Sequence, residues 1–256
     1  MKRALVGVAL AALAAVAGCG SGDGSRQGDR PRLTVSAAAS LTQAFERYGQ
    51  RFAPATVRFN FAGSDELAAQ IRQGVKPDLY AAANMDLPDE LFDEGLVEKP
   101  MRFAGNRLVI AVPADSDRVS GLGDLGRDGV ALAIGGEGVP VGDYAREVVG
   151  RLPRGQARSI LANVRSAEPD VGGVVGKLAQ GAADAGFLYM TDVEAAEGQV
   201  RAIELPRALQ PSVEYGVAVV KGAKEASVAR DFMEGLLHGA GRDALREAGF
   251  EPPPGR

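Results

Sequence analysis

The chain has 256 residues, of which 46% are hydrophobic and 24% charged, and its formal net charge of -4 leaves no basic surplus for general nucleic-acid binding. One Cys and one His exclude a disulfide scaffold, a Cys/His zinc site and most His-dependent catalysis. Trp is absent and aromatic residues make up only 5%, so Ala, Val, Leu and Ile must supply most of the core. That bias favours buried parallel strands covered by helices.

The N-terminus is typical of a secretory signal. Lys2 and Arg3 precede an uncharged, mostly apolar run over 4–18, shorter than the roughly 20 residues of a membrane-spanning helix. The run ends in small residues before Cys19, the only Cys, and so resembles the lipobox of bacterial lipoproteins, in which the chain is cut before the Cys and the Cys is lipidated. We therefore expect a signal peptide over 1–18 and an extracytoplasmic protein anchored by lipid at Cys19. An ordinary signal peptide that happens to contain a Cys is the alternative.

Residues 20–31 contain no aliphatic or aromatic residue, so we expect 19–31 to form a flexible tether after the lipidated Cys. From residue 32, β-prone runs alternate with helical periodicity. The first predicted strand is followed by a helix for which Ser40 fits a capping box, and Ser64 opens the next helix. In chain order, the predicted elements of this half are strands at 33–35, 57–61, 78–82 and 108–112, with helices after Ser40, from Ser64 to Gly74 and over 86–95.

A second series of strands and helices follows. Its predicted elements are a strand at 130–134, a Gly-rich turn at 135–138, helices at 140–149 and 171–180, strands at 185–189 and 213–220, and two closing helices within 226–248. This alternation predicts an α/β fold with mostly parallel sheets and helices on both faces. A chain of this length is expected to divide into two lobes.

No metalloprotease, Walker A or nucleophile-elbow motif occurs, and the lone His238 lies in the closing helical region. Instead, a small or hydroxyl residue recurs where a strand runs into a helix. The four junctions are at Ser40, Ser64, Val141 and Val171. Helix N-termini bind anions through unpaired N–H groups, and serine hydroxyls add neutral donors. The alternative is that both serines only cap their helices.

Several segments, taken in order, resemble the molybdate-binding proteins of ABC transporters. They are Ala37 to Thr42, Phe61 to Ile71, Gly74 to Ala83, Asn106 to Val109, Gly138 to Ala145, Ala167 to Val171, Gly186 to Tyr189 and Val213 to Gly222. The resemblance covers about residues 32–250. It implies a two-lobed type II periplasmic-binding fold with the ligand cleft between lobes. Lobe I is expected at 32–112 and 217–256, and lobe II at 113–216.

The same resemblance implies an oxyanion site made by Ser40, Ser64, Val141, Val171 and Tyr189. It implies a monomeric receptor, not an enzyme, with no cofactor, metal cation or nucleic-acid partner. This receptor would capture molybdate or tungstate and deliver it to a membrane permease and its ATPase. Sulfate or another tetrahedral oxyanion is an alternative ligand, and a secreted Ser/Lys hydrolase is a remote alternative.

Several relatives have hydroxyl or small residues after the second Ser, where this chain has Asp65 and Glu66. Both carboxylates suit a helix N-terminus, and we expect both to point away from the cleft.

Overall fold

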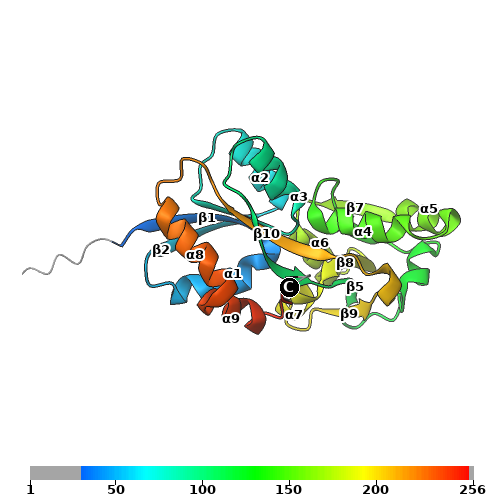
Figure 1. Cartoon of the computed structure of the whole chain (residues 1–256). Helices are drawn as coiled ribbons and strands as arrows, with labels where there is room; N and C mark the ends of the chain where they lie inside the picture. The colour runs from blue at the N-terminus through cyan, green and yellow to red at the C-terminus, as the bar shows by residue number, and fades with distance from the viewer. Residues whose placement is uncertain (1–29, 254–256) are drawn as a thin grey trace, which may run out of the picture.

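The computed structural model describes residues 30–253, so the signal peptide, Cys19 and all but the last residues of the predicted tether lie outside the described residues. Figure 1 shows two lobes side by side, each a sheet flanked by helices. Each sheet has five strands. This architecture confirms the predicted two-lobed α/β fold. Within 30–253, no helix combines the length and apolarity needed to cross a membrane.

The sheet of the first lobe has the strand order β2-β1-β3-β10-β4. Its strands are β1 (Arg32–Ala38), β2 (Thr56–Ala62), β3 (Leu79–Ala82), β4 (Met101–Asn106) and β10 (Val213–Val219). Its helices are α1 (Thr42–Arg51), α2 (Ser64–Arg72), α3 (Asp86–Asp93), α8 (Ala226–His238) and α9 (Ala240–Glu247). The orange and red helices α8 and α9 therefore return to the lobe that holds the blue N-terminal strand (Figure 1).

The sheet of the second lobe has the order β7-β6-β8-β5-β9. Its strands are β5 (Leu108–Pro113), β6 (Leu132–Gly135), β7 (Val164–Glu168), β8 (Ala185–Tyr189) and β9 (Val200–Glu204). Its helices are α4 (Pro140–Gly150), α5 (Arg154–Ala162), α6 (Val171–Ala179) and α7 (Met190–Ala195). Every residue of β8 is buried, as the continuous apolar pattern of a central strand predicts.

The structure differs from the expectation in the directions of the strands and in the boundaries of the lobes. Both sheets are mixed rather than mostly parallel, because β10 runs antiparallel to β3 and β4, and β5 runs antiparallel to β8 and β9. Strand β5 belongs to the second lobe and all of β10 to the first. The chain therefore crosses at Arg107 and again between β9 and β10, earlier than the expected boundaries after residues 112 and 216.

Five elements have no counterpart among the predictions: β4, α5, β7, α7 and β9. Strand β7 alternates between partly buried and exposed residues at a sheet edge, and α5 buries only Ile160. Helix α7 has only six residues. Short elements that bury few apolar side chains carry little periodicity. Strand β4 buries four residues in a row, but the last two are Gly105 and Asn106, so its sequence lacks the apolar pattern of a strand.

Candidate functional site

A small cavity lies between the two lobes where the N-terminal ends of several helices meet. Its volume is about 20 Å³, whereas two other cavities of the described chain reach 260 and 440 Å³. One water requires roughly 10–15 Å³ on this scale, so the cavity suits a compact ion better than an organic molecule. The lining residues are Ala38, Ala39, Ser40, Ala62, Gly63, Ser64, Ala83, Val139, Pro140, Val141, Asp170, Val171 and Tyr189.

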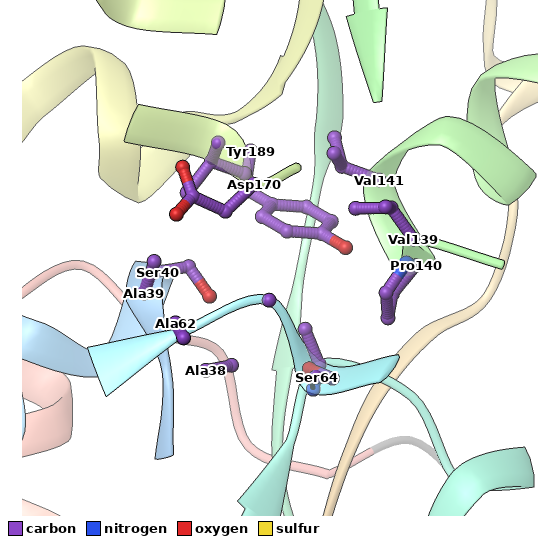
Figure 2. Close-up of a pocket in the computed structure, with 13 residues that line it drawn as sticks. Ala38, Ala39, Ser40, Ala62, Ser64, Val139, Pro140, Val141, Asp170 and Tyr189 are labelled. Carbon is purple, nitrogen blue, oxygen red and sulfur yellow. Dashed lines mark hydrogen bonds between the residues drawn. The ribbon is translucent and has the colours of Figure 1, made fainter. Parts of the chain in front are cut away.

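The five predicted site residues all line this cavity. Figure 2 shows Ser40 and Ser64 on one side, from the first lobe, and Val141 and Tyr189 on the other, from the second. Residues more than 140 positions apart in the chain are thus brought together. The sequence prediction did not include Asp170, which also lines the cavity.

Ser40 lies in a 3-10 turn (Ala39–Leu41) that follows β1, and α1 begins only at Thr42. Its side chain does not cap that helix, so the expected capping box is wrong. The Thr42 hydroxyl bonds back to the Ala39 carbonyl and helps to close the turn. The Ser40 Oγ lies 3.0 Å from the Tyr215 hydroxyl. It makes no capping hydrogen bond to α1, so it is available to the cavity.

Ser64 is the first residue of α2, whose N-cap is Gly63, so this serine is not a cap either. Its Oγ accepts a hydrogen bond of 3.1 Å from the backbone N–H of Ala83, while its carbonyl accepts one of 2.7 Å from the Tyr80 hydroxyl. A hydroxyl that accepts from a backbone N–H keeps its own proton for another partner. The fold therefore presents Ser64 to the cavity as a donor.

Val141 and Val171 lie in the first turns of α4 and α6, where a helix leaves its N–H groups without intrahelical acceptors. Close approach of α4 to β6 positions the first of these turns. A Cβ at Gly135 or Gly142 would come within 3.0 Å of the backbone of the other. Only glycine at both positions lets α4 begin this near the sheet, with its positive end at the cavity.

Tyr189 closes the cavity from the second lobe. Its side chain is buried between the rings of Tyr144 and Tyr215, which it meets edge to face at 6.3 and 5.8 Å. Burial raises the pKa of the Tyr189 hydroxyl well above its usual value, so the group stays a protonated donor. Among the described residues no protein group accepts its hydrogen bond. A buried donor left unpaired costs about 1–3 kcal/mol, so the site favours a ligand that supplies an acceptor.

No Lys or Arg lines the cavity. The Asp170 carboxylate accepts a 2.9 Å bond from Gly173 N as the N-cap of α6, and Figure 2 shows it turned to the side opposite the Tyr189 hydroxyl. Asp143, in the first turn of α4, does not line the cavity. Burial raises the pKa of its carboxyl, and the negative charge of Asp65 raises it further. An anion here depends on neutral donors and helix ends rather than on cationic side chains.

The two carboxylates after Ser64 behave differently from each other. Glu66 is exposed and bonds Gln70 on the same helix, as expected. Asp65 is partly buried, and its Oδ1 is enclosed without a partner among the described residues. It does not line the cavity, but it lies near Gly63 at the edge where the lobes meet.

Within 30–253, no three Asp, Glu, His or Cys side chains gather into a group that could hold a metal ion. The small cavity, the helix N-termini and the neutral donors between the two lobes together suit a small anion.

The chain belongs to the bacterial extracellular solute-binding proteins, whose family pattern it matches over residues 33–251. It is a transport binding protein and not an enzyme, which removes the hydrolase alternative.

Two curated relatives cover nearly the whole chain. The molybdate-binding protein ModA of Mycobacterium tuberculosis is 33% identical over 94% of each chain. A putative ABC transporter substrate-binding lipoprotein of Bacillus subtilis, YvgL, is 30% identical over 97% of this chain and 98% of its own.

Two solved structures share the fold. The periplasmic molybdate-binding protein of Azotobacter vinelandii superposes with a TM-score of 0.77 and 21% identity, over 86% of this chain and 99% of its own. The sulfate-binding protein SubI of Mycobacterium tuberculosis gives 0.76 and 17% over 88% of each chain.

Proposed function

We propose that the protein captures molybdate, and also tungstate, outside the cytoplasm and delivers it to a membrane permease and its ATPase. The observation that carries the proposal is the donor character of the cavity. Ser64 is held as a donor by Ala83, and the buried Tyr189 hydroxyl has no acceptor among the described residues. Molybdate and tungstate are unprotonated dianions near neutral pH and need donors only. The near-full-length similarity to ModA supports the same ligand.

In the proposed complex, Ser40 and Ser64 donate their hydroxyl protons from the first lobe. Val141 and Val171 donate backbone N–H groups from the second lobe, and Tyr189 donates its phenolic proton. A ligand held from both sides stabilises the closed arrangement of the lobes. In this proposal the receptor acts as a monomer. It needs no cofactor, because it binds and releases its ligand unchanged.

Sulfate is the second candidate, favoured by the shared fold of the sulfate-binding protein SubI. Sulfate is also an unprotonated dianion, so donor character alone does not separate it from molybdate. It is smaller, so the cleft must close further or accept longer hydrogen bonds. Hydrogenphosphate carries one O–H that finds only donors in the cavity, and an unpaired buried group costs about 1–3 kcal/mol.

A thermal-shift panel at equal ligand concentrations tests the proposal. We expect the order molybdate ≈ tungstate > sulfate > phosphate, with a stabilisation of about 2.7 kcal/mol at a hundred times Kd. The chain has no Trp, so a dye or calorimetric readout is preferable to intrinsic fluorescence. A largest shift with sulfate would reassign the ligand, and a largest shift with phosphate would indicate that Asp65 turns into the cleft as an acceptor.

We also propose that Cys19 is lipidated after cleavage at residue 18. The lipobox resemblance supports this, and the Bacillus relative bears the name of a lipoprotein. Two or more acyl groups on one residue would anchor the protein stably. Mass spectrometry of the mature N-terminus from the native host tests the proposal: we expect a lipid-modified Cys19, and an unmodified N-terminus downstream of Cys19 would refute it.

A further inference from the structure

Behind Ser40, a chain of buried polar groups runs from the cavity to the second lobe. The hydroxyl of Tyr215, a fully buried residue of β10, lies 3.0 Å from Ser40 Oγ and 3.4 Å from Asn106 Nδ2. Asn106 Nδ2 also donates to the hydroxyl of Thr191 in α7, at 2.9 Å. Asn106 ends β4 at the first crossing between lobes, and β10 begins just after the second. The hydrogen-bonded chain therefore lies where the lobes are joined.

The direction of each hydrogen bond in this chain follows from its amide end. The Asn106 Oδ1 accepts a 2.9 Å bond from the backbone N–H of Arg107, which fixes the orientation of the amide. The Nδ2 group can therefore only donate, so the Tyr215 oxygen accepts from it. Either hydroxyl could donate in the 3.0 Å bond between Tyr215 and Ser40, but of the two groups bonded to the Tyr215 hydroxyl only Ser40 Oγ can accept, so we assign the single Tyr215 proton to Ser40. Because Ser40 accepts that proton, its own proton is directed elsewhere, and its hydroxyl faces the cavity.

We propose that Tyr215 is a positioning residue that, backed by Asn106, fixes the Ser40 hydroxyl as a donor and so makes the site select unprotonated over protonated oxyanions. This inference rests on the proposed function. A serine hydroxyl without such a partner can rotate to donate to one ligand and to accept from another. With Tyr215 donating to it, Ser40 is preset as a donor. An O–H of hydrogenphosphate then faces a donor instead of an acceptor.

Two further features support the assignment. The same polarity occurs at Ser64, which accepts from the N–H of Ala83, so both serines of the cavity are set as donors by groups behind them. A hydrogen bond that a hydroxyl accepts also polarises it and strengthens the bond that it donates. The Tyr215 ring packs edge to face on Phe103 and Phe250, at 6.1 and 5.2 Å, and these contacts hold its hydroxyl in place.

The experiment compares the affinities of molybdate, sulfate and phosphate for the wild type and Tyr215→Phe by calorimetric titration at about pH 8. Phe keeps the ring contacts and removes only the hydroxyl. We expect the affinity for molybdate to fall on the order of tenfold, because Ser40 keeps its hydroxyl but loses the partner that directs its proton to the ligand; this is at the lower end of the value of one hydrogen bond to a charged ligand. Hydrogenphosphate should bind as well as before or better. The molybdate-to-phosphate affinity ratio should thus fall by at least tenfold.

Tyr48→Phe is the matched control. Tyr48 is also buried, and its hydroxyl donates to the Phe232 carbonyl at 3.1 Å, but it does not line the cavity. Removing the Tyr48 hydroxyl should lower the melting temperature without changing the molybdate-to-phosphate affinity ratio. An unchanged ratio in Tyr215→Phe, or an equal loss for all anions, would show that Tyr215 only supports the fold.

Two more variants keep the inference testable. In Ser40→Ala, adding Tyr215→Phe should change the ratio no further, because Tyr215 acts through Ser40; additive changes would overturn the inference. Asn106→Asp removes the donor behind Tyr215 and should also lower the ratio. The added negative charge weakens the binding of molybdate and of hydrogenphosphate alike, so this effect cancels in the ratio of their affinities. A wild type that prefers sulfate would refute the molybdate proposal alone, since the sulfate-to-phosphate ratio then tests Tyr215 in the same way.

Discussion

Gly63 offers a direct test of how the lobes close on the ligand. It precedes α2 in the first lobe, and its missing side chain faces the second. A Cβ at this position would lie less than 3.0 Å from the carbonyl oxygen of Pro169, which follows β7. The backbone angles of Gly63 are φ -58° and ψ 139°, a conformation that alanine adopts without strain. Gly63→Ala therefore places a methyl group between closed lobes. Within the first lobe the new Cβ also comes within 3.0 Å of the Asp65 Oδ1, the free end of a partly buried side chain, whereas the Pro169 oxygen belongs to the backbone.

The size of the effect follows from the geometry. Ordinary contact between non-bonded heavy atoms is about 3.5–4.0 Å, so the Pro169 carbonyl must retreat by roughly 1 Å. Hydrogen bonds of normal length from both lobes to one small anion cannot survive that separation. Losing two charge-assisted bonds, each worth about 1.5–3 kcal/mol, weakens binding on the order of a hundredfold or more.

Calorimetric titration of Gly63→Ala with molybdate measures this loss, and thermal unfolding without ligand checks the fold. We expect a melting temperature close to that of the wild type. Gly155→Ala is the matched control, because a Cβ at Gly155, in α5, meets no atom within 4 Å. That variant should bind normally. Wild-type affinity in Gly63→Ala would refute the reasoning, since the bound lobes would then not make the Gly63–Pro169 contact.

Two further predictions concern the donors and the packing of the first lobe. Replacing both Ser40 and Ser64 with Ala should weaken molybdate binding on the order of a hundredfold or more, and Tyr189→Phe should weaken it less, because two donors are lost instead of one; titration showing wild-type affinity in the double variant would place the site elsewhere. Gly235→Ala in α8 puts a Cβ well inside 3.0 Å of the Tyr48 hydroxyl, so it should destabilise the protein by about 1–3 kcal/mol in urea unfolding despite the better helix propensity of Ala, with ligand affinity retained. Unchanged stability would mean that Tyr48 moves aside freely.

The sequence was informative where a pattern is local and periodic. The bounds of the buried strand β8 and of the amphipathic helix α2 were predicted to within a few residues. An unbroken apolar strand and a 3.6-residue repeat each have a distinct signature in the sequence. The five site residues were located by their resemblance to a family, and all five line one cavity. Local evidence alone left Ser40 and Ser64 open to a simpler interpretation as helix caps, and neither serine is one.

What the sequence did not indicate depends on partners that are distant in the chain. Tyr215 lies 175 positions from Ser40 and 109 from Asn106, so no local motif links the three. The lobe boundaries were misplaced because a β-prone run such as β5 does not indicate which sheet it joins. Pairing is decided by side-chain contacts with neighbouring strands, and these exist only in the folded chain.

The buried carboxyl of Asp192, in α7, predicts a pH dependence of stability. The residue is only 7% exposed, and its Oδ2 accepts a 3.1 Å bond from the backbone N–H of Tyr189. Burial raises the pKa of Asp192 from 3.8 to about 7, although the Tyr189 bond opposes the shift and the charge of Asp170 adds to it. The folded protein thus binds a proton at Asp192 that the unfolded chain has already released between these values. The free energy of unfolding contributed by this group is fully present below about pH 4 and is lost as the pH rises through about 7.

Asp192→Asn keeps an acceptor for the Tyr189 N–H and cannot ionise. Its free energy of unfolding, relative to the wild type, should rise between pH 5 and pH 8 by at most about 2.7 kcal/mol, because about two pH units of the shift lie in this window. Urea unfolding at both pH values measures the difference. Asp124→Asn is a control with a different pH window, because hydrogen bonds from Ser120 lower the pKa of the partly buried Asp124 below its usual 3.8. The stability from this carboxylate is present above about pH 4 and is lost at lower pH, so the difference between that variant and the wild type should stay flat between pH 5 and pH 8. A flat difference for Asp192→Asn would show that the carboxyl reaches water and ionises normally in the folded protein.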